Sequence, residues 1–256
     1  MVDRGRARGA IRTAVVWEVL RAALEERAGG GRQCQSVLDA GGGTGGFAVP
    51  LAELGHQVVV VDPSPDALAA LERRVAEAGV GDRVRAVQGD AIDAAGVVGD
   101  QRMDVVLCHG VLEHVDDPTA TAAALCEVLA PGGLLSVLVA NRHALVLSRA
   151  LAGHFAQARH ALEDPAGRWG PFDPTPRRYS REEIVDLLVR AGVQPRSVHG
   201  IRVFSDLVPG ALLDLEPDNV DELLALESAA AAHPVLGAIA TQLHVLATVA
   251  VSASGP

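Results

Sequence analysis

Apolar residues along this chain alternate between short continuous runs and helical spacings. Runs such as QVVVVD at 57–62 and DVVLC at 104–108 are rich in β-branched and aliphatic side chains, which is typical of strands covered on both faces. Residues 11–24 instead space their apolar positions as one face of a helix does. Strands that alternate with helices predict an α/β fold, a Rossmann-like doubly wound sheet with right-handed crossovers.

The boundaries of most elements follow from these runs and from local stop signals. Ser180 and Glu183 form a capping-box pattern, in which each side chain can satisfy a free backbone N–H of the other residue. Pro131, Gly132 and Gly133 are expected to end a helix and turn the chain into the next strand. The expected strands are 36–40, 57–62, 84–88, 104–108, 134–140, 197–204 and 244–251, and the expected helices 11–24, 46–54, 65–78, 119–129, 181–190 and 221–232.

The alternation is interrupted at residues 141–180, which are rich in proline, arginine and histidine and show only a partial helical pattern at 145–152. An insertion of this size is usually a lid or a substrate-binding element. We therefore expect one domain over 1–256, with a helical segment at 1–30 and a lid insertion at 141–180.

Composition narrows the possible chemistry. The 256 residues contain no lysine, which excludes a P-loop nucleotide triphosphatase and Schiff-base catalysis. The formal charge of −10 means that a nucleic acid would have to be bound by a local basic patch. Cys34, Cys108 and Cys126 show neither C-x-x-C pairing nor zinc spacing, so they predict buried, reduced thiols in a cytoplasmic protein without a bound metal.

The two ends of the chain give no sign of a membrane protein. The first twelve residues are polar and arginine-rich, unlike a secretory signal. The apolar segment 235–251 contains Gln242 and His244 and is better interpreted as the end of a compact fold than as a membrane span. We expect no membrane association, and either a monomer or a homodimer.

The stretch LDAGGGTGGFA at 38–48 forms a glycine-rich loop between a predicted strand and a predicted helix. Its glycines fit G-x-G-x-x-G through Gly41, Gly43 and Gly46, and they also fit G-x-G-x-G through Gly41, Gly43 and Gly45. Such loops bring backbone N–H groups and a helix N-terminus close to a nucleotide. The spacing alone does not distinguish a dinucleotide from another nucleoside cofactor.

Three acidic residues favour one cofactor. Asp39, Asp62 and Asp90 lie at the carboxyl ends of the first three predicted strands, where ligands bind in an open α/β sheet. Asp62 is placed to accept hydrogen bonds from both ribose hydroxyls, and Asp90 from an adenine amino group. A carboxylate at Asp39, just before the glycines, would repel a pyrophosphate and attract a cationic sulfonium and amino group. The three acids therefore favour S-adenosylmethionine over NAD.

The motifs LDAGGGTGG, VVVVDPSPDAL, QGDA, CHGVLEHV and LAPGGLLSVLVAN resemble, in the same order, those of class I S-adenosylmethionine-dependent methyltransferases. The resemblance covers residues 36–141. It implies a seven-stranded sheet whose last strand is antiparallel.

Further motifs lie outside that core: RGAIRTAVVW, the pair His109 and Glu113, NRH at 141–143, GIRVFSD and HVLATV. They are similar to the bacterial tRNA 5-carboxymethoxyuridine methyltransferases, which esterify the carboxylate of a modified wobble uridine. The similarity implies that Arg12 reaches the methionyl carboxylate of the cofactor and that His109 lies against it. The expected cofactor contacts are Arg12, Asp39, Gly41, Gly42, Gly43, Asp62, Asp90, Ala91, Ile92 and His109.

The acceptor is less clearly indicated than the cofactor. Arginines are suited to position an anionic acceptor, and Trp169, Phe172 or Tyr179 could stack on a base as readily as they could pack within the lid. A tRNA enzyme is expected to carry a dense basic run in the insertion. This insertion departs from that expectation, because its arginines are accompanied by Glu163, Asp164 and Asp173. The expected acceptor contacts are Asn141, Arg142, His143, Arg177, Arg178, Tyr179 and Arg202.

Methyl transfer is an in-line displacement in which alignment is the main task of the protein. A carboxylate acceptor is ionised near neutrality and needs no general base, so no catalytic acid or base is expected. For a hydroxyl acceptor, His109 or His143 would be the first candidates for proton removal. The alternatives left open are a small acidic or phenolic acceptor, an NAD-dependent oxidoreductase and a non-catalytic cofactor-binding regulator.

Overall fold

A computed structural model describes residues 4–31, 33–213 and 218–249 of the chain. The strands form one seven-stranded sheet in the order β3-β2-β1-β4-β5-β7-β6, and its last strand, β7, is antiparallel. The contacts divide the chain into two compact units. Of the described residues, the Rossmann unit contains those within 26–138, 185–197 and 245–249, and the insertion unit contains those within 4–25, 139–184 and 198–244.

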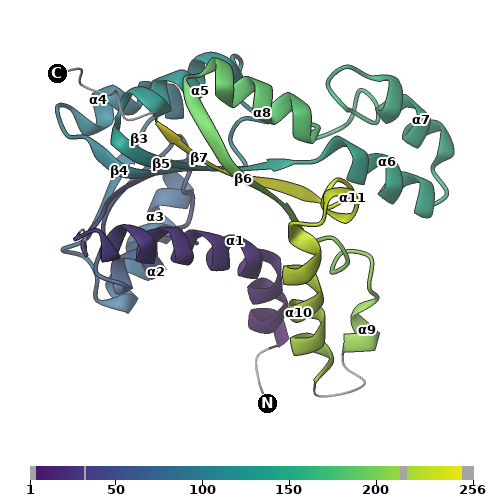
Figure 1. Cartoon of the computed structure of the whole chain (residues 1–256), viewed down its shortest axis with the longest axis horizontal. Helices are drawn as coiled ribbons and strands as arrows, with labels where there is room; N and C mark the ends of the chain where they lie inside the picture. Colours follow the sequence, from purple (N-terminus) through teal and green to yellow (C-terminus); the bar gives the residue numbers. More distant parts are fainter. Residues whose placement is uncertain (1–3, 32, 214–217, 250–256) are drawn as a thin grey trace. The chain divides into compact units, whose positions relative to one another are not determined.

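The parallel half of the sheet belongs to the Rossmann unit. β1 (Ser36–Ala40) pairs with β2 (Gln57–Asp62) on one side and with β4 (Met103–His109) on the other, and β2 pairs with β3 (Val84–Gln88). In Figure 1, α2 (Ala48–Glu53) and α3 (Pro65–Ala78) cover one face of these strands, and α4 (Ala94–Val98) and α5 (Pro118–Glu127) cover the other. Both faces are therefore buried, which accounts for the continuous apolar runs.

The strand β5 (Leu129–Ala140) begins earlier than the sequence predicts. Residues 131–133 were expected to be a turn before the strand, but they form an irregularity within it, since Met103 pairs with Leu129 and Val105 with Leu134. Proline has no N–H for the ladder, and Gly132 has a φ of 69°, so the extra residues bulge out of the pairing. Arg27 fixes this bulge by donating to the Gly132 carbonyl and to Asp104 Oδ1.

The insertion unit contains more helix than its sequence pattern predicts. α6 (Arg142–Leu151) matches the partial helical pattern, whereas α7 (Phe155–Glu163) was not expected. The predicted capping box at α8 (Arg181–Arg190) is confirmed, since Ser180 N–H donates to Glu183 Oε2 at 2.6 Å and Glu183 N–H to Ser180 Oγ at 3.2 Å. The remaining elements are α1 (Arg4–Gly29), a 3-10 turn (Ala91–Asp93), β6 (Val193–Ile201), α9 (Gly210–Leu213), α10 (Asn219–Ala231), α11 (Pro234–Gly237) and β7 (Gln242–Val249).

The burial of the cysteines differs in part from what the sequence predicts. Cys34 is exposed rather than buried, because it lies in the loop before β1 with its thiol against the Gly55 carbonyl. Cys108 is buried as expected, and burial raises the pKa of its thiol, whereas Cys126 is only half-buried. The predicted end of the last strand, at 250–251, lies outside the described residues. Among the described residues, no helix is long and apolar enough to cross a membrane, and no three His, Cys, Asp or Glu side chains gather as metal ligands.

Candidate active site

Asp62, the last residue of β2, connects the second strand to the glycine loop. Its Oδ2 accepts from Gly43 N–H at 2.9 Å, and its Oδ1 accepts from Ser64 N–H at 2.9 Å. Each carboxylate oxygen keeps a second lone pair. The side chain lines a cavity of about 520 Å³, so these lone pairs are suited to accept from a pair of vicinal hydroxyls.

The glycine loop follows the shorter of its two possible spacings. Gly45 has a φ of 79°, and a Cβ there would lie 2.3 Å from Leu71 Cδ1. Gly46 has no atom within 4 Å of such a Cβ, and its φ is not positive. A side chain is thus excluded at Gly45 but tolerated at Gly46. The structural requirement is G-x-G-x-G through Gly41, Gly43 and Gly45.

Asp39 lies beneath this loop on β1 and is only 3% exposed. A Cβ added at Gly42 would lie 2.6 Å from Asp39 Oδ2, so only glycine lets the loop approach the carboxyl group this closely. Burial, with a smaller contribution from the charge of Asp62, raises the pKa of Asp39 to about 7. Among the described residues, Asp39 Oδ2 has no hydrogen-bond partner. A nearby cation stabilises the ionised form of a buried carboxyl group that lacks other partners.

The other end of the same cavity, the glycine-loop cavity, is lined by Asp90, Ala91, Ile92 and Val111. Asp90 precedes the 3-10 turn, but its carboxylate does not cap it, so the oxygens can accept from a ligand. Ile92 is 48% exposed although it is aliphatic. The combination of an exposed apolar face and a carboxylate is suited to a flat heteroaromatic ring that bears an amino group.

The electrostatics of this cavity select a cation rather than a diphosphate. Its lining includes four acids and no arginine. The backbone N–H groups of Gly41, Gly43 and Gly45 already donate to Val61 O, Asp62 Oδ2 and Gly42 O. They are therefore not available to a pyrophosphate, which such loops otherwise bind through these groups. The residues present fit a nucleoside that carries positive charge.

His109, at the end of β4, is held by its neighbours. Its Nε2 lies 2.8 Å from Ser136 Oγ, and its ring packs edge-on against Phe47 with centroids 4.6 Å apart. Burial lowers the pKa of His109 to about 3, so the imidazole is neutral. The next residues along the chain, Gly110 and Val111, line the glycine-loop cavity. Cofactor contact by His109 itself stays a prediction.

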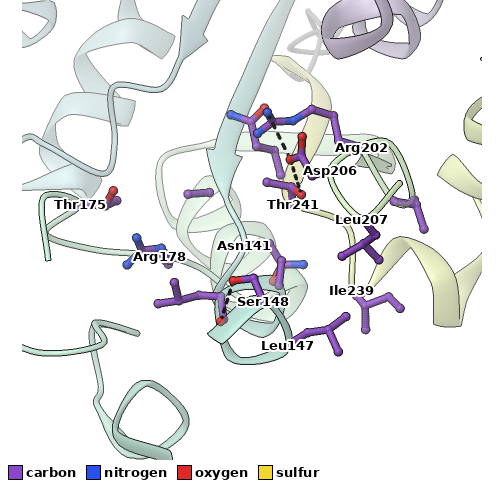
Figure 2. Close-up of a pocket in the computed structure, with 15 residues that line it drawn as sticks. Asn141, Leu147, Ser148, Thr175, Arg178, Arg202, Asp206, Leu207, Ile239 and Thr241 are labelled. Atoms are coloured by element: carbon purple, nitrogen blue, oxygen red, sulfur yellow. Dashed lines mark hydrogen bonds and ion pairs between the residues drawn. The ribbon is translucent and has the colours of Figure 1, made fainter. Parts of the chain in front are cut away.

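The insertion unit has a cavity of its own, of about 330 Å³. Figure 2 shows Arg202, Asp206 and Thr241 joined along one side of it: Arg202 Nη1 lies 3.3 Å from Asp206 Oδ2, which accepts from Thr241 Oγ1 at 2.9 Å. Arg202 Nε is buried and has no hydrogen-bond partner among the described residues. Leu147 and Ile239 supply apolar surface. This cavity, the Arg202 cavity, combines a largely buried guanidinium with an apolar lining.

Two other predicted acceptor residues line the Arg202 cavity but use their polar groups within the protein. The amide of Asn141 donates to the carbonyls of Ala238 and Ala240 at 2.8 and 2.7 Å, and its Oδ1 accepts from His143 N–H. Arg178 forms a two-pronged pair with Asp173, with N···O distances of 2.7 and 3.0 Å. Both side chains therefore hold the walls of the cavity in place.

The remaining predicted acceptor residues do not line this cavity. Arg142 pairs with Glu183 and donates to the Asp164 carbonyl, and His143 is exposed. Tyr179 is 5% exposed and pairs through its backbone with Asn141. Arg177 is half-buried.

Arg12, predicted to contact the cofactor, lies on the exposed side of α1 in the insertion unit. Its charge acts on Arg202 and helps to lower the pKa of that guanidinium, after the larger effect of burial. The two arginines are thus electrostatic neighbours, a proximity that their wide separation along the chain did not reveal.

Several residues of these cavities were not expected from the sequence. Val111 packs directly against Gly41, since a Cβ added at Gly41 would lie 2.3 Å from Val111 Cγ2. Asp206 and Thr241 accompany Arg202, and Glu227 supports the turn that follows it. No local motif marks Thr241 or Glu227, because both are distant from Arg202 along the chain and come close to it only in the folded protein.

The sheet order, the glycine loop and the acid-lined cavity together define a nucleoside-dependent enzyme of the methyltransferase type. The methyltransferase domain family matches residues 10–198, and the chain belongs to the class I S-adenosylmethionine-dependent methyltransferases. Its cofactor is S-adenosylmethionine.

The chain is also similar to individual methyltransferases. The chain is 34% identical to the tRNA 5-carboxymethoxyuridine methyltransferase of Escherichia coli K12 over 204 residues, covering 79% of this chain and 75% of the relative. It is 33% identical to a ubiquinone biosynthesis O-methyltransferase of Cereibacter sphaeroides over 159 residues, covering 62% and 60%. Among solved structures, magnesium protoporphyrin IX methyltransferase from Synechocystis PCC 6803, with S-adenosylhomocysteine bound, superposes with a TM-score of 0.58 at 15% identity, covering 95% and 83%.

Proposed function

We propose that this methyltransferase esterifies the carboxylate of a modified wobble uridine in tRNA, with the whole chain acting as one methyltransferase domain. The observation that carries the proposal is Arg202, a largely buried guanidinium that lines the Arg202 cavity with its Nε unpartnered among the described residues. An arginine in an apolar surrounding favours a planar anion such as a carboxylate. The similarity to the tRNA enzyme of E. coli supports the same acceptor.

The residues proposed to hold the cofactor are those of the glycine-loop cavity and its floor. Asp62 would bind the ribose, Asp90, Ala91 and Ile92 the adenine, and ionised Asp39 the positively charged end. Gly41, Gly42, Gly43 and His109 would shape the wall, and Arg12 would reach the methionyl carboxylate. When bound, S-adenosylmethionine supplies an electrophilic methyl group.

The chain's own task is to align the acceptor and exclude water. A carboxylate is already ionised at neutral pH, so no residue needs to remove a proton from it. Arg202 would hold the carboxylate in one orientation, and the apolar side of the Arg202 cavity would keep water from it. Alignment of this kind can contribute about 7–11 kcal/mol to lowering a barrier.

The surface of the insertion is more basic than its composition suggests. Two of its three acids are buried within turns: the Asp173 side chain is 0% exposed and that of Asp164 is 9% exposed. Both accept backbone N–H groups, Asp173 from Trp169 and Thr175, Asp164 from Ala166 and Arg168. Asp164 and Asp173 are thus structural, and Glu163 is the one acid of the insertion that stays exposed.

The exposed side chains of the insertion include arginines and aromatic residues, which are suited to bind RNA. Arg159 is exposed, and Arg149 stacks 4.5 Å from the ring of Trp169. Phe155 and Phe172 are 72% and 85% exposed. Exposed aromatics among arginines bind single-stranded nucleic acid by stacking and charge. The proposed acceptor contacts of this unit are Asn141, Arg142, His143, Arg177, Arg178, Tyr179 and Arg202.

A small acidic or phenolic acceptor is the second candidate. It is supported by the largely apolar lining of the Arg202 cavity and by the ubiquinone-pathway relatives. A phenol would have to lose a proton. Burial lowers the pKa of His109 to about 3 and makes it a weak base, so of the two histidines proposed for this step the exposed His143 is the better candidate.

Methyl transfer from labelled S-adenosylmethionine distinguishes the two candidates. The protein is incubated with bulk tRNA or with a small-molecule extract, and the product is treated with mild alkali. Label in tRNA that is released by alkali identifies an ester and supports the proposal. Label that appears only in the extract contradicts it.

A further inference from the structure

Glu227 is a charged residue in the interior of the insertion unit. It lies on α10 and is 1% exposed. Its carboxylate accepts three consecutive backbone N–H groups: Oε2 from Val203 at 2.8 Å, and Oε1 from Phe204 at 3.0 Å and from Ser205 at 2.7 Å. A buried carboxylate is tolerated when several such donors satisfy it. Glu227 therefore fixes the first three residues after Arg202.

Arg202 has an unusual backbone at the start of this turn. Its φ is 61°, and it is the one non-glycine residue with positive φ in the part of the chain that the structure describes. This conformation is strained for an arginine, whereas glycine adopts it freely. Its carbonyl accepts from Thr241 N–H at 3.1 Å, so the backbone is held from both sides.

The Arg202 side chain lines the Arg202 cavity. Arg202 Nη1 lies 3.3 Å from Asp206 Oδ2. Burial lowers the pKa of the guanidinium, and the charges of Asp206 and of the buried Glu227 oppose this shift. Asp206 is itself fixed by the hydroxyl of Thr241. A glycine would relieve the strain but would remove the guanidinium, so the strain is explained if the guanidinium has a function.

We propose that Glu227 is a positioning residue for the acceptor carboxylate and acts through the backbone of Arg202. The carboxylate of Glu227 gathers the N–H groups of residues 203–205 into one turn, and this turn sets the direction of the Arg202 side chain. The inference rests on the proposed function, since it takes Arg202 as the group that binds the acceptor.

The test compares four variants of the full-length protein with tRNA as acceptor: Glu227→Gln, Arg202→Ala, Arg202→Gly and the double variant Glu227→Gln/Arg202→Ala. Glu222→Gln is the matched control, because Glu222 is an exposed acid on the same helix. The measurements are KM and kcat for tRNA, the affinity for S-adenosylhomocysteine, and the melting temperature.

We expect Glu227→Gln to raise KM for tRNA about tenfold, the equivalent of about 1.4 kcal/mol, with S-adenosylhomocysteine affinity unchanged. In the double variant the Gln substitution should add nothing to the loss caused by Arg202→Ala, since residues that act through one another are not additive. Arg202→Gly should melt higher than Arg202→Ala, because glycine relieves the positive φ.

Two outcomes overturn the inference in different ways. If Arg202→Ala raises KM and Glu227→Gln does not, or if their effects add, the positioning role is wrong and the proposed function stands. If Arg202→Ala leaves KM at the parent value, the acceptor assignment fails and the inference fails with it. Should the Gln variant not fold, Glu227→Asp, which keeps the charge but shortens the reach to the three N–H groups, is measured in its place against the same outcomes.

Discussion

Asp62 Oδ2 accepts a hydrogen bond from the backbone N–H of Gly43 at 2.9 Å, so the carboxylate proposed to bind the ribose also holds the glycine loop. This relationship ties cofactor binding to the conformation of the loop. If Asp62 binds the ribose as proposed, one residue at the end of β2 performs both tasks.

Replacing Asp62 by alanine should abolish measurable binding of S-adenosylhomocysteine in calorimetry. The variant loses the ribose acceptor and also leaves Gly43 N–H and Ser64 N–H without their partner. Asp66→Ala is the control, because Asp66 is an exposed acid in the first turn of α3. Equal affinity in the Asp62 variant and the parent protein would refute the ribose assignment.

The glycine loop offers a matched pair of substitutions. Gly45→Ala should lower the free energy of unfolding by about 2 kcal/mol, since its Cβ would meet Leu71 and its φ is positive. Gly46→Ala should change stability little, because nothing lies within 4 Å of the new Cβ. Denaturant unfolding measures both. Equal losses, or a larger loss in Gly46→Ala, would contradict the assignment of the G-x-G-x-G spacing.

Asp39 should make stability depend on pH. Its pKa is raised to about 7 in the folded protein, mainly by burial, while an unfolded aspartate has a pKa of about 3.9. Between these values the folded state holds a proton that the unfolded state has released, so raising the pH from about 4 to about 7 favours unfolding. Asp39→Asn should flatten this part of the profile. An unchanged slope in urea titrations across that range would contradict the prediction.

The same group should make cofactor binding depend on pH in the opposite direction. Ionisation of Asp39 through a pKa of about 7 creates the charge that attracts the sulfonium, so affinity for S-adenosylmethionine should rise from about pH 6 to about pH 8. The neutral thioether S-adenosylhomocysteine should show a weaker rise. Calorimetry at these pH values checks this, and a rise that persists in Asp39→Asn would assign it to another group.

Arg178→Ala should weaken use of the acceptor and spare the cofactor. Arg178 neutralises Asp173, whose side chain is 0% exposed, so the variant leaves a buried charge and should destabilise the insertion by about 3–5 kcal/mol. The second substitution Asp173→Asn should restore part of that loss. S-adenosylhomocysteine affinity should stay at the parent value, because Arg178 does not line the glycine-loop cavity; a large drop would show that the two cavities are coupled.

The sequence was most informative where one local pattern determines one element. The strands at 36–40, 57–62 and 84–88 and the helix at 65–78 were predicted with their observed bounds, because continuous apolar runs and flanking turns suffice there. The acids at the strand ends could be recognised for the same reason, since parallel strands place their carboxyl ends along one edge of the sheet.

The sequence was least informative where residues distant along the chain cooperate. α7 was missed because residues 155–163 mix polar and apolar positions. The choice between Gly45 and Gly46 depends on Leu71, and the strain at Arg202 depends on Glu227. The acids of the insertion were taken as surface charge, whereas Asp164 and Asp173 build its turns.

The acceptor is tested most directly by mass spectrometry of nucleosides from tRNA of a strain that lacks this activity, after incubation with the protein and S-adenosylmethionine. We predict that the wobble uridine bearing a carboxymethoxy group becomes one methyl group heavier, and that Arg202→Ala slows this change. The proposed function would be contradicted if the carboxymethoxy uridine gained no methyl group while the same preparation efficiently methylated a phenolic quinone precursor.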